Sequence, residues 1–421
     1  MLRLIQRAIR LEWPVRLLNP LLGKFNPFLP EFRVDPYTAY HALRAHDPVY
    51  FSPVLRGWML TRYADIAGVL HDPRFSVDRM QSKMFQRLNP LRGLDSDFAQ
   101  AITRNLLMLD PPDHTRLRRL VNKAFTPRRV EALRPRIALV AAQLLDSIAD
   151  AREIDLVRDL AYPLPVIVIA EMLGVPAADR EQFKRWSDAL VTLLDPFQAE
   201  DGLAPAQRAF GEFCEYFRRV VAARRRQPQD DLVSALVAVE ERGDTLNEAE
   251  LLSLCMLLLG AGNETTTNLL GNAVLALLRH PDERRRLQAD PSLMPTAVEE
   301  FLRYESPIQA TDRVAMQDCE IDGRRVRKGQ LVGLLLGAAN RDPARFPHPD
   351  RLDVGRRDND HLAFSHGTHF CLGAALARAE AEITLAAFLQ RFPSFDGDTA
   401  PRGWKRSMIV RGLTSLPLRL H

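Results

Sequence analysis

The stretch Phe364–Glu380, FSHGTHFCLGAALARAE, places Cys371 between a loop rich in glycine and histidine and an alanine-rich segment. Apolar residues then recur at helical spacing, which predicts a helix starting at the cysteine: Leu372, Leu376, Ala379 and Ile383. Free amides and the dipole at a helix N-terminus stabilise a thiolate. Such a thiolate suits a metal ligand or a nucleophile, and an inert, buried cysteine beside a turn is the alternative.

The composition is that of a globular protein with a sizeable core. The chain has 421 residues, 46% of them hydrophobic and 26% charged. Its four cysteines form no CxxC pair, which argues against a zinc site or disulfide framework and favours the cytoplasm. The net charge is only +4, and no basic tail indicates nucleic acid binding. The longest charge-free apolar run, LLSLCMLLLGAGN, is too short for a transmembrane segment.

The pattern predicts one domain, residues 1–421, that is mainly α-helical with a small β region. VYFSP and GWMLTR predict an early hairpin, and CEIDGRRVRKGQLVGLLL predicts a second one turned at Asp322-Gly323. Residues 1–18 form a possible amphipathic extension. This extension could touch a membrane surface, or it could pack on the body or fray.

The longest helix predicted from the pattern runs from Thr245 to a stop at Pro281, with Thr245 and Glu248 as its capping box. It is apolar almost all round, so we expect it to cross the core. Its middle, GAGNETTT, contains two glycines that each cost about 1 kcal/mol in a helix. We interpret this as a helix opened by a threonine hydroxyl, with the acid Glu264 able to relay protons; a tolerated irregularity is the alternative.

Two further segments carry charge at helical spacing. Glu300 and Arg303 lie at i, i+3 in EEFLRYESP. In DPPDHTRLRRLVNKAF, His114 and Arg118 share one helical face. Three cations lie on roughly the opposite face: Arg116, Arg119 and Lys123. Alone, both segments would be ordinary solvated helices.

The cysteine loop closely resembles the haem-binding loop of the cytochrome P450 family, especially its soluble bacterial members. The match is to the pattern F-G-x-G-x-[HR]-x-C-x-G and is carried by Phe364, Gly367, His369, Cys371 and Gly373. Ser365 stands where the family usually has glycine. The resemblance covers essentially the whole chain. It implies the P450 fold, in which a long central helix crosses over the haem, and it implies heme b (iron protoporphyrin IX) with Cys371 as the metal ligand.

The same resemblance assigns roles to the other motifs. AGNETT resembles the oxygen-activation motif of the family. This implies that Ala261 adjoins the cofactor and that Glu264 and Thr265 deliver protons during dioxygen activation. It also makes Asn263 a candidate substrate or water contact. Glu300, Arg303 and Arg351 would form a buried structural network, which His366 could join. The haem propionates would be bound by His114, Arg118, Arg313 and His369. Ile308 and Ala310 are either substrate contacts or plain core.

The resemblance therefore implies a haem-thiolate monooxygenase that inserts one oxygen atom of O2 into a lipophilic small molecule, by hydroxylation or epoxidation. Electrons would come from NAD(P)H through a separate ferredoxin and ferredoxin reductase, or a flavodoxin, and the cations opposite His114 would bind an acidic ferredoxin. We expect a cytoplasmic monomer. The alternatives are a peroxide-driven peroxygenase, against which Glu264 and Thr265 argue, and a non-catalytic helical binding protein. Steroids, terpenoids, fatty acyl chains and macrolides all remain open as substrates.

Overall fold

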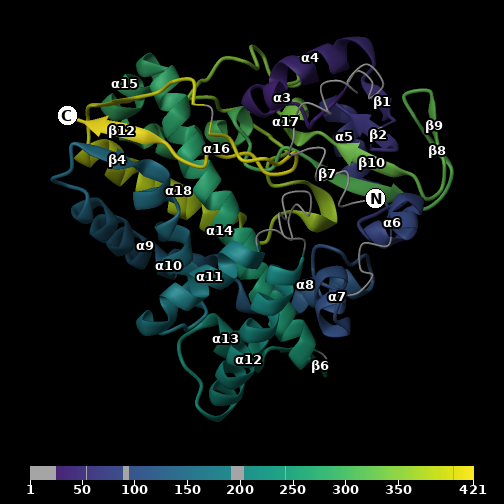
Figure 1. The fold of residues 1–421 in the computed structure, drawn as a ribbon, viewed down its shortest axis with the longest axis horizontal. Coiled ribbons are helices and arrows are strands. Elements are labelled where there is room, and N and C mark those ends of the chain that lie inside the picture. Colours follow the sequence, from purple (N-terminus) through teal and green to yellow (C-terminus); the bar gives the residue numbers. More distant parts are fainter. Residues whose placement is uncertain (1–24, 54, 89–93, 191–202, 242, 402) are drawn as a thin grey trace.

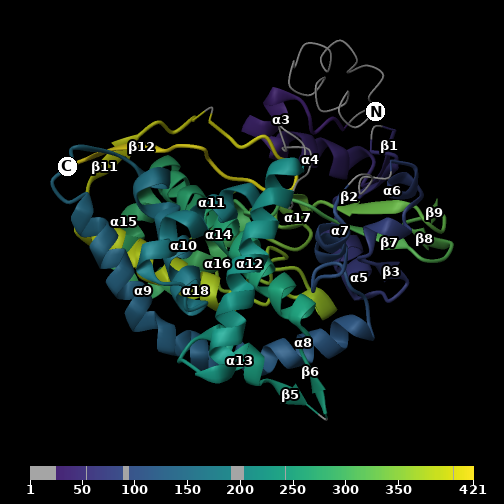
Figure 2. The same cartoon turned by 60° about the horizontal axis from the view of Figure 1, so that its bottom comes forward.

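The computed structural model describes residues 25–53, 55–88, 94–190, 203–241, 243–401 and 403–421. The possible N-terminal extension, residues 1–18, lies outside them. Helices make up most of the molecule, and a sheet occupies one side (Figures 1 and 2). Helix α14 (Glu248–Arg279) passes through the middle in both views. The prediction of a mainly helical fold with a small β region is confirmed.

The other helices surround α14. Their bounds are α3 (Pro30–Val34), α4 (Pro36–His46), α5 (Tyr63–His71), α6 (Lys83–Leu88), α7 (Ser96–Thr103), α8 (Asp113–Ala124), α9 (Pro127–Ser147), α10 (Pro163–Met172), α11 (Arg180–Leu190), α12 (Ala204–Arg226), α13 (Leu232–Ala238), α15 (Pro281–Ala289), α16 (Met294–Tyr304), α17 (Leu336–Ala339) and α18 (Ala374–Arg391). None of the helices in the described part of the chain has both the length and the hydropathy of a membrane span.

The main sheet has five strands in the order β1-β2-β10-β7-β3. They are β1 (Val49–Ser52), β2 (Gly57–Leu60), β10 (Leu331–Leu334), β7 (Thr311–Ala315) and β3 (Phe75–Ser76). The pair β2–β10 is parallel and the others are antiparallel. A three-stranded sheet joins β11 (Phe395–Gly397), β12 (Pro417–Leu420) and β4 (Glu153–Asp155), and β5 (Glu240–Glu241) pairs with β6 (Asp244–Thr245).

Both predicted hairpins form. Strands β1 and β2 pair antiparallel, and β8 (Cys319–Ile321) pairs with β9 (Arg324–Val326). Asp322 and Gly323 have φ of 46° and 74°, as a two-residue type I′ turn requires. The last part of the second hairpin sequence instead forms β10, which continues the main sheet between β2 and β7.

The N-cap of α14 is Asn247, two residues after the predicted N-cap, Thr245. The side chain of Asn247 accepts a hydrogen bond from the Glu250 N–H at 2.9 Å, and the Glu250 carboxylate accepts one from the Asn247 N–H at 2.9 Å. The predicted capping box at Thr245 and Glu248 is therefore wrong, because Thr245 belongs to β6. The helix ends at Arg279, ahead of Pro281.

The middle of α14 lies between two hydrophobic clusters. Leu251–Leu259 pack with residues of α7, α8, α11, α12 and α13. Leu269–Leu277 pack with residues of α9, α16 and α18. The segment between them carries the polar side chains and Gly262, where a Cβ would lie 2.7 Å from the Cδ1 of Ile169 in α10. A side chain at that position would require the Ile169 side chain to move, so Gly262 allows close packing of α10 on α14.

Candidate functional site

The cysteine loop is closed by its own backbone. Cys371 lies two residues before Gly373, the N-cap of α18, and its N–H donates to the Phe364 carbonyl at 2.9 Å. Ser365 has φ of 61°, in the left-handed region, and its N–H donates to the Leu362 carbonyl at 2.9 Å. The serine therefore keeps the backbone conformation that glycine takes at lower cost, by about 1–2 kcal/mol.

The electrostatics of the thiol differ from the prediction for a helix N-terminus. Burial raises the pKa of Cys371, and the Gly373 N–H, Arg118 and Arg378 only partly oppose that rise. The Gly373 N–H at the helix start therefore favours the thiolate as expected, but burial of the metal-free thiol outweighs this effect. A metal that binds this sulfur must displace its proton, which couples metal binding to pH.

Four predicted propionate-binding residues converge beside the cysteine. His114 is buried on α8, and within the described residues neither of its ring nitrogens has a hydrogen-bond partner. Its ring centroid lies 4.1 Å from that of His369. Burial, with the neighbouring His114, Arg313 and Arg118, lowers the pKa of His369 to about 3. Residues from α8, β7 and the cysteine loop thus form one cluster of positive and potentially positive groups.

This cluster has no counter-ion in the described part of the chain. Arg313 is buried and donates to the carbonyl of Asp312 at 2.8 Å, and no carboxylate forms an ion pair with Arg118 or Arg313 there. Asp312 and Asp110 act on the cluster without forming an ion pair with it. Asp312 is paired with Arg79, and Ser76 and Val77 donate to the Asp110 carboxylate. Buried cations without a partner are costly, so the cluster fits a bound dianion such as the two propionates of haem.

The start of α18 is open at Gly373. No described atom lies within 4 Å of the position that a Cβ on this glycine would take. This opening, the sulfur of Cys371 and the orphaned His114 ring would suit a cofactor that takes a sulfur ligand and carries carboxylates. The residues present therefore fit haem b.

The polar stretch of α14 makes part of the predicted arrangement. The Thr265 hydroxyl donates to the Ala261 carbonyl at 2.8 Å, which is the predicted bond back into the helix. The helix nevertheless runs without interruption through this segment, so the predicted opening is not seen. Among the described residues no hydrogen bond joins the side chains of Glu264 and Thr265, and Glu264 accepts one from Lys405 at 2.6 Å.

The candidate substrate contacts occupy different environments. Asn263 is buried, donates to the Ser187 hydroxyl of α11 at 2.8 Å and accepts from Thr267 at 3.3 Å, so its amide joins α14 to α11. Ala310 packs in a hydrophobic cluster near α3 and α4, which supports the core alternative. Ile308 is half-buried and pairs through its backbone with Val410.

The structural network contains Glu300 and Arg303 as predicted, but not the side chain of Arg351. Arg303 donates to both carboxylate oxygens of Glu300 at 2.8 Å, and both side chains are fully buried. Arg356 supplies the third member, with its Nε 3.0 Å from Glu300 Oε2. Arg351 is exposed and contributes only its carbonyl, 3.3 Å from Arg303 Nη2. The assignment of Arg351 is therefore wrong.

His366 also lies outside this network. It pairs with Asp360 at 3.3 Å, so the suggestion that it joins Glu300 is wrong. The sequence does not predict the part that two residues, Arg356 and Lys405, play in these contacts. Both bond to acids more than 50 positions away along the chain, and neither belongs to a motif. For Arg356 the only signal was its place in the arginine-containing segment after Pro349.

The outer face of α8 differs in part from the prediction. Arg119 and Lys123 are exposed, as expected. Arg116 instead forms ion pairs with Asp244 of β6 and Glu250 of α14. It holds α8 against the start of α14 and does not face solvent alone.

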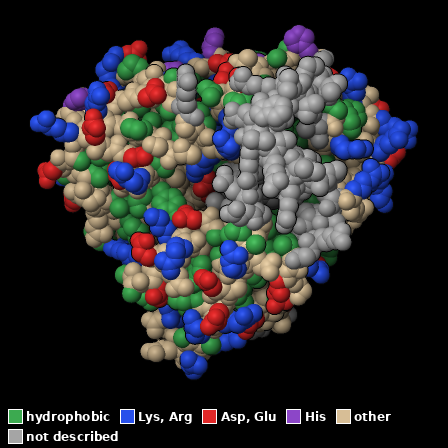
Figure 3. Space-filling model, viewed as in Figure 1, with side chains coloured by type: hydrophobic (Ala, Val, Ile, Leu, Met, Phe, Trp, Pro, Cys, Tyr) green, Lys and Arg blue, Asp and Glu red, His purple; other side chains and the backbone are tan. Residues whose placement is uncertain are grey.

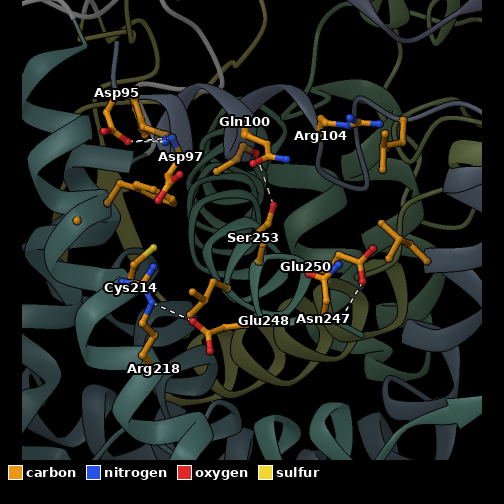
Figure 4. A pocket seen from close by; sticks show the side chains of 18 of the residues that line it. Asp95, Asp97, Gln100, Arg104, Cys214, Arg218, Asn247, Glu248, Glu250 and Ser253 are labelled. Carbon is orange, nitrogen blue, oxygen red and sulfur yellow. Dashed lines mark hydrogen bonds and ion pairs between the residues drawn. The ribbon is translucent and has the colours of Figure 1, made fainter. Parts of the chain in front are cut away.

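A separate cavity of about 650 Å³ opens beside the first turns of α14. Figure 4 shows acids and arginines around it, including Asp97, Arg104 and Glu248, with Ser253 between α14 and α7. None of the residues lining it belongs to the cysteine loop or to the stretch Ala261–Thr267. This cavity is therefore distinct from the cluster that fits haem.

Comparison with known proteins gives consistent matches. The cytochrome P450 family model matches residues 50–403. Cytochrome P450 107B1 of Saccharopolyspora erythraea is 43% identical, covering 92% of this chain and 96% of its own. The vitamin D(3) 25-hydroxylase of Pseudonocardia autotrophica is 43% identical, covering 92% and 94%. The solved structure of the Bacillus subtilis polyketide-synthase cytochrome P450 PksS has a TM-score of 0.87 at 38% identity, covering 94% and 99%.

Proposed function

This chain belongs to the cytochrome P450 family, and from that premise we propose that Cys371 would bind the haem iron as a thiolate and that the cluster around His114 would bind the propionates. As a family member it is a haem b monooxygenase that oxidises lipophilic small molecules with O2 and electrons from a redox partner. The haem supplies the iron at which dioxygen is activated. One observation carries the residue assignments: a buried positive cluster without a counter-ion lies beside Cys371. Among the described residues, Cys371 is the only cysteine at a helix start.

Each group in the cluster has a binding role in this proposal. Arg118 and Arg313 donate charge-assisted hydrogen bonds to the propionates, and His114 and His369 donate from their ring nitrogens. Phe364 packs beneath the guanidinium of Arg378, 4.7 Å from its ring centroid, and so holds the cysteine loop against α18. Gly373 leaves the cofactor side of that helix start open.

The polar stretch of α14 supplies the proton path. We assign Glu264 as the acid and Thr265 as the alcohol, with Ala261 next to the cofactor and accepting the resting hydrogen bond of Thr265. This pair favours reduction of O2 with delivered protons over the peroxygenase alternative. Membership of the family argues against the non-catalytic binding protein.

We retain Ile308 as the candidate substrate contact, since Ala310 packs in the core and Asn263 bonds to α11. Ile308 is half-buried and also packs against the hydrophobic residues of the main sheet. We propose a single-domain monomer that receives electrons from a ferredoxin or flavodoxin. The four described cysteines are all unpaired, which supports the cytoplasm as its location.

Substitution of the cysteine tests the central assignment. Cys371→Ser should remove the long-wavelength absorption of the reduced carbon monoxide complex, because a hydroxyl is not ionised near neutral pH and is a weaker donor to iron. Cys319→Ser, at a half-buried cysteine of β8, is the matched control and should leave the spectrum unchanged. A normal spectrum in Cys371→Ser would show that another residue binds the iron.

A further inference from the structure

The acid of the polar stretch is held by a lysine from near the end of the chain. Lys405 Nζ donates to Glu264 Oε1 at 2.6 Å and to Asn268 Oδ1 at 3.0 Å. Asn268 Nδ2 adds a hydrogen bond to the same Glu264 oxygen at 3.3 Å. The side chains of Lys405 and Glu264 are only 18% and 13% exposed, so this ion pair is stronger than a typical surface pair.

In this arrangement the acid and the alcohol point to different partners. Glu264 is bonded to Lys405 and Asn268, while the Thr265 hydroxyl is bonded to the Ala261 carbonyl. Among the described residues no hydrogen bond joins the two side chains, so a proton passes between them only after a rearrangement or through a bridging water. The structure therefore shows Glu264 Oε1 bonded to Lys405 and Asn268, and not to Thr265.

The loop that carries Lys405 is built to lie against this face of α14. Asn268 and Asn272 follow Glu264 at intervals of four, so the three side chains form one polar stripe. Asn272 donates to the Arg411 carbonyl at 3.0 Å, and a Cβ on Gly412 would collide with Asn268. The Lys405 N–H donates to the Gly412 carbonyl at 3.0 Å, which closes the loop over the stripe.

The same loop also holds the candidate substrate segment. The Gln309 N–H donates to the Ile409 carbonyl at 2.7 Å, and the Arg411 N–H donates to the Pro307 carbonyl at 2.7 Å. Ile308 pairs with Val410 between these two bonds. Residues 403–413 therefore connect segment 307–310 to the acid of the relay through a short, continuous set of hydrogen bonds.

We propose that Lys405 is a positioning residue that holds Glu264 in reserve until substrate binds. Substrate that displaces segment 307–310 moves the loop, and Lys405 withdraws. The carboxylate of Glu264 is then free to take up a proton from solvent and donate it to the Thr265 hydroxyl oxygen, while Thr265 gives up its own hydroxyl proton toward the cofactor site. This inference rests on the proposed relay through Glu264 and Thr265. Its consequence is that the enzyme consumes little O2 when no substrate is present.

Substitution of the lysine in the haem-loaded enzyme tests this role. We expect Lys405→Met to raise substrate-free, NAD(P)H-dependent O2 consumption about tenfold, equivalent to about 1.4 kcal/mol, with a surrogate ferredoxin system as electron donor. Lys405→Arg should behave like the wild type, because it keeps the charge. Arg406→Met, at the exposed neighbouring cation, is the matched control and should change nothing.

A further readout tests the direct contact between the two side chains. In a double-mutant cycle, the double variant Glu264→Gln, Lys405→Met should lower the melting temperature by less than the sum of the decreases in the two single variants.

The possible outcomes distinguish failure of the proposed proton relay from failure of the role proposed for Lys405. If Glu264→Gln leaves product per NAD(P)H unchanged, the relay itself is wrong. If Glu264→Gln uncouples the enzyme but Lys405→Met keeps the wild-type substrate-free rate, the role of Lys405 is overturned, even if stability falls. Should Lys405→Met fail to retain haem, Lys405→Gln, which can still hydrogen-bond but carries no charge, is measured by the same criteria.

Discussion

Ser365 occupies a backbone conformation that ordinarily selects glycine. Its φ is 61°, and its buried hydroxyl has no hydrogen-bond partner within the described residues. Ser365→Gly should therefore raise the free energy of unfolding by about 0.5–1 kcal/mol, since the relief of left-handed strain exceeds the entropy that glycine adds to the unfolded chain. Urea unfolding of the haem-loaded protein measures this change.

Ser365→Ala is the matched control for that substitution. Alanine keeps the strain and removes only an unpartnered hydroxyl, so its stability should stay within about 0.5 kcal/mol of the wild type. Equal stabilisation by alanine and glycine would mean that the hydroxyl, rather than the backbone, is the source of the cost.

At the residue scale, the sequence predicts well where a motif joins adjacent positions. Cys371 and His369 lie in one short loop, and His114 and Arg118 share one helical turn, so spacing alone places each pair. Arg351 was assigned in place of Arg356 because spacing in an irregular segment does not determine which side chain turns inward. Only the folded backbone of that segment does so.

At the scale of elements, the buried network joins α16 to the irregular segment after α17. Arg356 donates to Glu300 at 3.0 Å from a side chain that is 11% exposed, whereas Arg351 is exposed. Arg356→Met should lower the free energy of unfolding by about 1.5–3 kcal/mol, the value of a hydrogen bond to a charged group. Arg351→Met should change it by less than about 0.5 kcal/mol. A larger loss for Arg351 in urea unfolding would contradict this assignment.

A second contact of α16, made by Glu299, contributes stability that is lost at low pH. Burial alone would raise the pKa of Glu299, but Arg378, at 2.6 Å, and His361, at 3.3 Å, hold it at about 2. Because the folded pKa lies below the unfolded value of 4.5, the stabilisation is fully present above pH 4.5 and is lost as the pH falls toward 2. Glu299→Gln should cost about 2–3 kcal/mol at pH 6.

Urea unfolding between pH 6 and pH 3 checks this expectation. The difference between the wild type and Glu299→Gln should shrink as the pH falls, because the wild-type carboxylate then binds a proton and loses its pairs. A difference that is independent of pH would show that packing, not charge, makes the contribution.

Helices and hairpins were the most predictable elements. The largely apolar character of α14 and the Asp322-Gly323 turn are local signals, and both elements form within a few residues of the prediction. The start of α14 was misplaced because Thr245-Glu248 and Asn247-Glu250 are equally good local caps, and only the pairing of β6 with β5 excludes the first. The contact between Lys405 and Glu264 has no local signal, since it spans 141 positions.

At the scale of the whole molecule, charge is mixed and much of it is internally paired. Figure 3 shows basic and acidic side chains interspersed on one face. Arg116 illustrates why composition alone misjudges a docking surface, because Asp244 and Glu250 bind a cation that the sequence places on the outer side of α8. Only Arg119 and Lys123 of the three predicted docking cations are exposed.

Arg119 and Lys123 are the candidate docking residues for the redox partner. His114 and Arg118 of the same helix belong to the proposed haem cluster, so the outer face of α8 lies on a short electron path to the cofactor. An acidic ferredoxin should associate faster with a positive surface there, and salt should weaken that attraction. We expect Arg119→Glu with Lys123→Glu to slow reduction by the ferredoxin about tenfold at low salt. Stopped-flow absorbance with carbon monoxide present measures the rate.

Two controls make that measurement decisive. Reduction by dithionite should be unchanged in the double variant, because dithionite needs no docking surface. Lys328→Glu, in the turn after β9 at the edge of the molecule away from α8 in Figures 1 and 2, should reduce as fast as the wild type. Arg116→Glu is unsuitable, since it would bring a third carboxylate to Asp244 and Glu250 and disturb the contact between α8 and α14. If the double variant is reduced by ferredoxin at the wild-type rate and with the same salt dependence, the partner docks on another face, because loss of two positive charges from the true site must slow encounter.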